Sequence, residues 1–72
     1  MPVPEMQPVS SSNIAAIGYD AESQMVYVQF LNGSTYAYKG VPEHEFDNLR
    51  TAPSVGSYLN RYYKNVYPYE RA

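Results

Sequence analysis

The side chains best suited to ligand chemistry are the basic and tyrosine residues in the last third of the chain. Residues 50–72 carry four Lys or Arg side chains against one Glu, a net charge of +3. The rest of the chain carries one Lys against six acidic side chains, a net charge of −5. Cations can pair with a phosphate and tyrosine rings can stack on a base, so the segment is typical of a nucleotide-type site. An ordinary cationic end of a helix accounts for the same charges.

The nucleotide hypothesis gives these side chains separate roles. Arg61 and Lys64 are expected to contact the anion, and the ring of Tyr58 or Tyr62 to provide a stacking surface. The start of a helix adds donors, because its first N–H groups have no partner within the helix. The hydroxyls of residues 10–12 add further donors at the mouth of a site, or else form the turn before a strand. The complete candidate ligand-binding set is Ser11, Ser12, Tyr36, Tyr38, Ser54, Gly56, Tyr58, Asn60, Arg61, Tyr62 and Lys64.

Catalytic chemistry has weaker support in the sequence. His44 and Asp47 are spaced to share one face of a helix, but no nucleophile or oxyanion site can be assigned beside them. A solvated acidic helix face explains the pair better. The chain has no Cys and one His, which removes the usual zinc-ligand spacings, and it has no glycine-rich phosphate motif. We therefore expect a protein that is not an enzyme and holds no metal or cofactor.

A hairpin over residues 25–39 is the element that must position the tyrosines. Its two runs of β-branched and aromatic residues flank Asn32–Gly33, a dipeptide that favours tight turns. A two-residue loop would pair Tyr36 with Gln29, whereas a three-residue loop with a bulge at the glycine would pair it with Val28. The two registers place the tyrosine on opposite faces of the sheet. We favour the bulged register, because it collects the apolar side chains on one face.

The remaining elements follow from local signals, and together they predict an α+β fold. We expect an extended or disordered arm over residues 1–9 and a strand over 14–19. A helix is predicted over 42–51, and Ser54 is a suitable N-cap for a second helix. The second helix is predicted to pack on the sheet through an apolar stripe formed by Val55, Tyr58, Leu59 and Tyr62. The predicted single domain, residues 10–72, is a three-stranded antiparallel sheet followed by two short helices packed on one face.

The length of the chain bears on its assembly and location. A domain of 72 residues buries only about 60% of the surface that its unfolded chain exposes. Small cores without disulfides often depend on oligomerisation, so we expect a homo-oligomer. No apolar run reaches the ~18 residues of a membrane span, and the first residues do not form a signal-peptide pattern. We expect a cytoplasmic protein that does not enter a membrane.

This order of pieces resembles the KTSC domain family, which is named for a C-terminal extension of some lysyl-tRNA synthetases. The resemblance extends from about Ser11 to Tyr67 and includes a tyrosine pair on the hairpin and a turn into the second helix. The matching positions are Ser11–Ser12, Ile14, Ile17–Asp20, Val26, Val28, Phe30, Asn32–Gly33, Tyr36–Tyr38, Val41–Pro42, Ser54–Gly56, Tyr58–Asn60 and Tyr67. The association with a tRNA synthetase implies RNA as a candidate ligand, and the resemblance implies no catalytic residues.

Two functional hypotheses remain open at this point. In the first, the protein is a non-catalytic binding module for a small nucleotide or a single-stranded RNA segment, acting by sequestration in a homo-oligomer. The net charge of −2 at pH 7 favours a small nucleotide over a long polyanion. In the second, the tyrosine-rich face docks another protein, because Tyr and Arg are enriched at interface hot spots.

Overall fold

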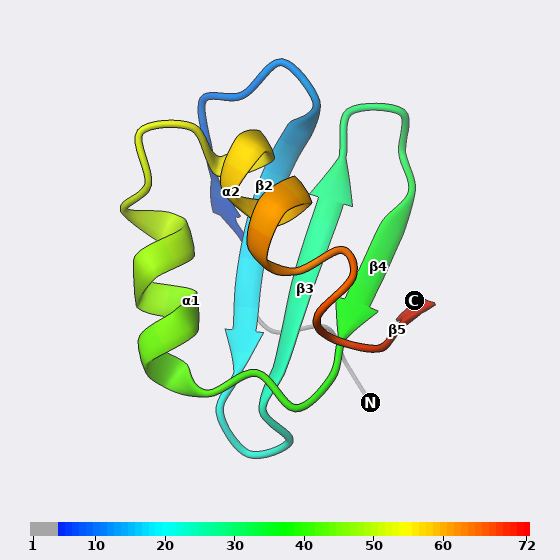
Figure 1. Ribbon diagram of the computed structural model, residues 1–72. Coiled ribbons are helices and arrows are strands. Elements are labelled where there is room, and N and C mark those ends of the chain that lie inside the picture. Colours follow the sequence, from blue (N-terminus) through cyan, green and yellow to red (C-terminus); the bar gives the residue numbers. More distant parts are fainter. Residues whose placement is uncertain (1–4) are drawn as a thin grey trace.

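An antiparallel sheet carries both helices on one of its faces (Figure 1). The computed structural model describes residues 5–72. Its elements are β1 (Gln7–Pro8), β2 (Ile14–Asp20), β3 (Met25–Phe30), β4 (Thr35–Tyr38), α1 (Glu43–Arg50), α2 (Val55–Tyr62) and β5 (Tyr69–Arg71). The strands are neighbours in the order of the sequence, and each pair is antiparallel. The predicted α+β fold, with its strands preceding two helices on one sheet face, is confirmed.

Two edge strands extend the predicted three-stranded sheet to five strands among the described residues. β1 pairs with β2 and places Gln7 opposite Ile17, whereas β5 pairs with β4 and places Tyr69 opposite Tyr38. The edge strands have two and three residues, which is too short for the alternation of side chains that reveals a strand in a sequence. β1 falls within the arm predicted over residues 1–9, and residues 1–4 of that arm lie outside the described part.

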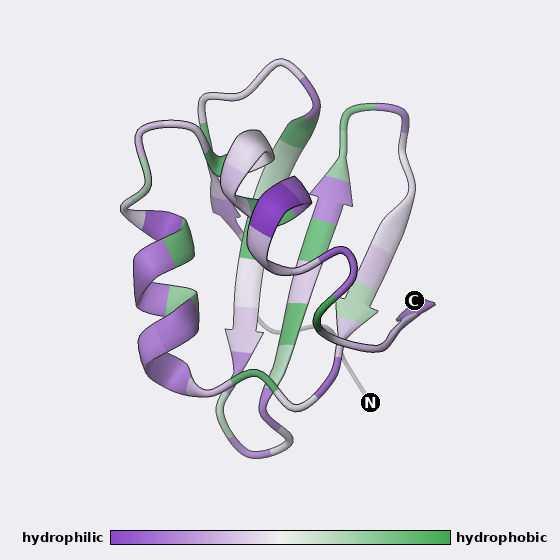
Figure 2. Cartoon of the chain, viewed as in Figure 1, coloured by the Kyte–Doolittle hydropathy of each residue, from purple (hydrophilic) through white to green (hydrophobic). Residues whose placement is uncertain are grey.

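The hairpin between β3 and β4 has the bulged register. Val28 is opposite Tyr36, and Val26 is opposite Tyr38, as the three-residue loop predicts. The loop needs a residue with positive φ, and Gly33 supplies it at +94°. The residue colours in Figure 2 show hydrophobic and hydrophilic residues alternating along most of β3. The register therefore turns both tyrosines of β4 toward the helices.

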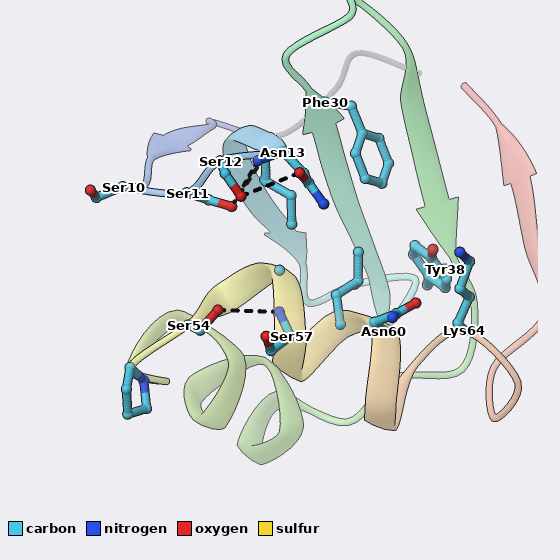
Figure 3. Close-up of a pocket in the computed structure, with 14 residues that line it drawn as sticks. Ser10, Ser11, Ser12, Asn13, Phe30, Tyr38, Ser54, Ser57, Asn60 and Lys64 are labelled. Carbon is cyan, nitrogen blue, oxygen red and sulfur yellow. Dashed lines mark hydrogen bonds between the residues drawn. The ribbon is translucent and has the colours of Figure 1, made fainter.

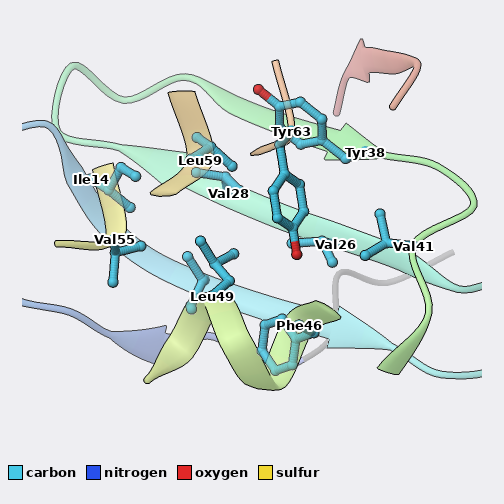
Figure 4. Packing of buried hydrophobic residues seen from close by; sticks show 11 residues of the cluster. Ile14, Val26, Val28, Tyr38, Val41, Phe46, Leu49, Val55, Leu59 and Tyr63 are labelled. Atoms are coloured by element: carbon cyan, nitrogen blue, oxygen red, sulfur yellow. The ribbon is translucent and has the colours of Figure 1, made fainter. Parts of the chain in front are cut away.

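The hydrophobic core lies between the sheet and the two helices (Figure 4). Its largest fully buried side chain is Tyr63, directly after α2, whose hydroxyl donates a hydrogen bond to the backbone oxygen of Glu45 at 3.1 Å. The prediction that Tyr62 belongs to the buried apolar stripe of α2 was wrong, since Tyr62 is 47% exposed. The inward positions of this segment are spaced four residues apart, and this brings Tyr63 rather than Tyr62 onto the sheet. They are Val55, Leu59 and Tyr63.

Glu45 of α1 also fixes the position of α2 through its side chain. The hydroxyl of Tyr58 donates a hydrogen bond of 2.6 Å to the Glu45 carboxylate. Burial and this carboxylate raise the pKa of Tyr58 to about 12, since both disfavour the phenolate. Burial is also the main reason why the pKa of Tyr63 is raised. Glu45 therefore contacts one tyrosine through its backbone and another through its side chain.

We predict that the stability gained from the Tyr58 hydroxyl disappears at alkaline pH. The pKa in the folded state is about 12, above the ordinary value of 10.0, so the contribution is complete below pH 10 and is lost as the pH rises toward 12. Urea unfolding of the wild type and Tyr58→Phe should give a difference in free energy that shrinks over this window. Tyr62→Phe is the control, because within residues 5–72 its hydroxyl has no hydrogen-bond partner. A difference for Tyr58→Phe that stays constant up to about pH 12 would contradict the prediction.

Candidate functional site

A groove of about 440 Å³ lies between α2 and the loop that joins β1 to β2 (Figure 3). The loop supplies one wall, and the first two turns of α2 supply the other. Apolar side chains from the sheet and from α2 form its floor. We call it the serine groove, and its lining residues are Ser10, Ser11, Ser12, Asn13, Ile14, Phe30, Tyr38, Pro53, Ser54, Gly56, Ser57, Leu59, Asn60 and Lys64.

The loop wall is held in shape by its own side chains. The Ser11 hydroxyl oxygen accepts hydrogen bonds from the backbone N–H groups of Asn13 at 3.2 Å and Ile14 at 3.3 Å. Ser12 donates to the side-chain oxygen of Asn13 at 3.3 Å. Because a hydroxyl has one proton and two acceptor sites, the Ser11 proton remains available to donate a hydrogen bond. The serine run thus forms the turn before β2 and also faces the groove.

The opposite wall begins at the start of α2. The Ser54 hydroxyl accepts a hydrogen bond from the backbone N–H of Ser57 at 3.3 Å, which confirms Ser54 as the N-cap. Within residues 5–72, the N–H groups of Val55 and Gly56 have no hydrogen-bond partner, as is expected for the first turn of a helix. This end of the helix carries a partial positive charge, so the wall is suited to an anion.

The loop and the helix approach each other closely at Gly56. A Cβ atom on this glycine would lie 3.3 Å from the Ser11 hydroxyl oxygen, which is a tight contact. Glycine costs helix propensity at this position, which predicts a close backbone approach either to the sheet or to a ligand. The neighbour in this structure is the serine loop. The absence of a side chain at this position therefore lets the two walls of the groove meet.

The charge of the groove comes from Lys64. It is the single ionisable group with a formal charge at pH 7 among the lining residues, and no Asp or Glu lines the groove. The ion pairs in the described part of the chain are Lys39 with Glu70 and Arg50 with Asp47, so Lys64 is not neutralised by a carboxylate there. A cation, hydroxyl donors and a helix start therefore surround one cavity.

A second, smaller hollow continues from the groove along the sheet. Its volume is about 310 Å³, and four of its six lining residues are aromatic. Three residues, Phe30, Tyr38 and Lys64, line both cavities. We call it the aromatic hollow, and its lining residues are Phe30, Asn32, Tyr36, Tyr38, Lys64 and Tyr69.

The structure brings together most of the side chains that the sequence proposes as a site. Those in the serine groove are Ser11, Ser12, Tyr38, Ser54, Gly56, Asn60 and Lys64. Tyr36 lines the aromatic hollow. Tyr38 is 3% exposed, and burial followed by the neighbouring Tyr69 and Tyr36 raises its pKa, so it is a neutral part of the floor.

Three predicted residues lie outside both cavities. The Tyr58 hydroxyl is bound to Glu45, and the Tyr58 ring lies 4.5 Å from that of Tyr62. The guanidinium of Arg61 lies over the Tyr62 ring, 5.9 Å from its centroid. Ligand contacts for these residues stay predictions.

Sequence reasoning missed several lining residues, including Asn13, Phe30 and Ser57. Asn13 directly follows the hydroxyl run at residues 10–12, and Ser57 follows the N-cap by three residues, so both carry a local signal. Phe30 is an apolar residue at the end of β3, and only the position of α2 over the sheet shows that it lines a cavity. Within residues 5–72, no three His, Cys, Asp or Glu side chains gather to form a metal site. No helix of that part is long and apolar enough to cross a membrane.

Comparison with known proteins places this geometry in a family. Residues 10–67 match the KTSC domain. The crystal structure of a KTSC domain protein from Yersinia pestis matches with a TM-score of 0.88 at 39% sequence identity, over 94% of this chain and 96% of that one. The chain belongs to the KTSC domain family.

Two sequence relatives show where the domain occurs. A protein from Tsukamurella paurometabola, named simply "Protein", is 47% identical over 55 residues, which cover 76% of this chain and 82% of the relative. A lysine–tRNA ligase from Nostoc punctiforme is 32% identical over 60 residues, which cover 83% of this chain and 11% of the ligase. The chain is thus a small KTSC domain protein related to a short part of some lysine–tRNA ligases, and these matches assign it no catalytic family.

We predict that Gly56 and Ser11 are energetically coupled. Gly56→Ala raises helix propensity, but the new Cβ atom would lie 3.3 Å from the Ser11 hydroxyl oxygen. Two backbone hydrogen bonds hold this oxygen in place. In a Ser11→Ala background this contact is gone, and Gly56→Ala should stabilise the protein by about 0.5–1 kcal/mol. With Ser11 present the gain should be absent or reversed. A double-mutant cycle in urea measures the coupling, and equal effects in the two backgrounds would contradict it.

Proposed function

We propose that this protein is a non-catalytic binding module for a nucleotide-type ligand whose phosphate lies in the serine groove. The observation that carries the proposal is the convergence of Lys64, the serine hydroxyls and the start of α2 on one cavity without a carboxylate. Charge-assisted hydrogen bonds from such donors are the ordinary means of holding a phosphate. The residues offer donors and a cation, and no nucleophile paired with a base is among them, which supports binding without reaction.

A small nucleotide suits this groove better than a long RNA. One lysine and one helix start can balance a phosphate monoester, whereas a polyanion needs a row of cations. The whole chain carries a net charge of −2, which disfavours an extended nucleic acid further. The relationship to a part of lysine–tRNA ligases supports RNA as the competing ligand, as a short single-stranded segment.

Retention of a ligand without reaction corresponds to sequestration, which we propose as the biological role. A homo-oligomer, expected from the small core, would enclose the open side of the groove and slow release. The protein-docking alternative is favoured by a different surface, where the exposed ring of Tyr62 stacks on Tyr58 and lies beneath Arg61. That surface is separate from the lining of the groove, so mutations can distinguish the two functions.

The test compares two charge-neutralising variants of neighbouring cations. Lys64→Gln removes the cation that lines the groove, and Arg61→Gln removes one that does not. Because both changes alter the net charge equally, long-range electrostatics are matched. In calorimetric titrations with guanosine monophosphate, Lys64→Gln should weaken binding about tenfold, the lower end for a charge-assisted hydrogen bond because the side chain is exposed. Arg61→Gln should change the affinity much less.

Thermal unfolding supplies an independent measurement, because a ligand that binds only the folded state raises the melting temperature. Guanosine monophosphate should stabilise the wild type and Arg61→Gln more than Lys64→Gln. Equal losses in both variants would show that only the general positive charge matters. Binding that is lost in Arg61→Gln alone would move the site to the surface around Tyr62 and overturn the groove proposal.

A further inference from the structure

We infer that the aromatic hollow is a subsite for a nucleobase with a carbonyl edge, so that the ligand is a keto-base nucleotide such as a guanine or uracil nucleotide. The inference rests on the proposed function, because it assigns the other end of the same ligand. The serine groove alone would accept any phosphate monoester, including a sugar phosphate without a base. The hollow beside it supplies the selectivity.

The walls of the hollow are suited to a planar ring. The Tyr36 ring meets Phe30 and Tyr69 edge to face, at centroid distances of 5.6 and 5.7 Å. Tyr69 also lies 5.2 Å from the ring of Tyr38 and keeps 51% of its surface exposed. Stacking or edge contacts with such rings stabilise a bound base and are tolerant of its identity. The rings therefore account for the binding of a base, and selectivity among bases requires a polar group.

Asn32 is the polar group at the rim of the hollow, and the hairpin turn sets its orientation. The backbone N–H of Ser34 donates a hydrogen bond to the Asn32 side-chain oxygen at 2.9 Å. A backbone N–H can only donate, so the oxygen must face the turn, and the amide NH₂ group is the free end. In the part of the chain that the structure describes, this NH₂ group has no acceptor. Asn32 thus presents a donor, which matches a carbonyl oxygen on the ligand.

The two cavities are arranged for one ligand. Lys64 and Tyr38 line both, and Figure 3 shows these two side chains next to each other, at the end of the groove away from the serine loop. A cation at the junction favours the phosphate end of a nucleotide whose base continues into the hollow. No Asp or Glu lines the hollow either, so an amino edge of a base would find no charged acceptor there. Guanine offers O6 and N7 acceptors, whereas adenine offers an amino donor in the place of O6.

Calorimetric titrations with three probes separate the base from the phosphate. The probes are guanosine monophosphate, adenosine monophosphate and ribose 5-phosphate, which has no base. The wild type should bind guanosine monophosphate about tenfold more tightly than ribose 5-phosphate, because the rings contact only the base. It should also prefer guanosine over adenosine monophosphate.

Two variants locate the base contact. Tyr69→Ala should lower the affinity for guanosine monophosphate about tenfold and leave the affinity for ribose 5-phosphate unchanged. Tyr62→Ala is the matched control, because Tyr62 is similarly exposed, at 47%, and lies outside the hollow. Asn32→Asp keeps an oxygen for the Ser34 N–H but replaces the free donor with an acceptor. Its added charge lowers the affinity for every phosphate, so the readout is the ratio of the affinities for the two nucleotides. This ratio should fall toward one, because the donor that matches guanine O6 is lost.

The outcomes distinguish this inference from the proposed function. If guanosine monophosphate and ribose 5-phosphate bind equally well, the base subsite is wrong and the phosphate site stands. If Tyr69→Ala lowers the affinity for guanosine monophosphate and for ribose 5-phosphate equally, the base lies elsewhere. The same conclusion follows if the ratio of the affinities for the two nucleotides is unchanged in Asn32→Asp. If neither nucleotide binds to the wild type, both the subsite and the proposed function are overturned.

Discussion

The positive φ of Gly33 is the constraint on which the candidate site depends. At +94°, it allows the three-residue loop that pairs Val28 with Tyr36 and Val26 with Tyr38. A step of one residue would turn both tyrosines to the opposite face of the sheet, because side chains alternate along a strand. The serine groove would then lose Tyr38 from its floor, and the aromatic hollow would lose both tyrosines. One turn thus links a local conformation to the surface that a ligand would contact.

A second constraint determines where α2 lies over this floor. Glu45 of α1 accepts hydrogen bonds from two tyrosines, Tyr58 within α2 and Tyr63 directly after it. Near the start of α2, the missing side chain of Gly56 leaves room for the serine loop. The helix is therefore fixed at its two ends by different partners. Its first turn faces the groove with unpaired N–H groups as a consequence of packing that also stabilises the fold. Binding capacity and stability are in this way supported by the same contacts.

The sequence predicted the elements with strong local signals and missed the relations between distant ones. The hairpin register followed from side-chain alternation, and the cap at Ser54 from residue type, because each depends on a few neighbouring residues. β5 was missed as a strand because its three residues form one only by pairing with β4. Tyr62 ends α2 and Tyr63 follows it directly, so the sequence pattern could not decide which of the two is buried. The aromatic hollow joins residues from β3, β4, β5 and the segment after α2, and no local pattern contains that information.

A titration of the ¹⁵N-labelled protein with guanosine monophosphate, followed by amide chemical shifts, tests most directly whether the ligand lies in the serine groove. If the phosphate lies in the serine groove, the largest changes fall on two segments distant in sequence, the serine loop at residues 11–13 and the start of α2 at Gly56 and Ser57. Changes at Lys64 and in the hairpin loop should accompany them. Shifts confined to the acidic face of α1 or to the surface around Tyr62, with the serine loop and Gly56 unchanged at saturation, would contradict binding in the serine groove.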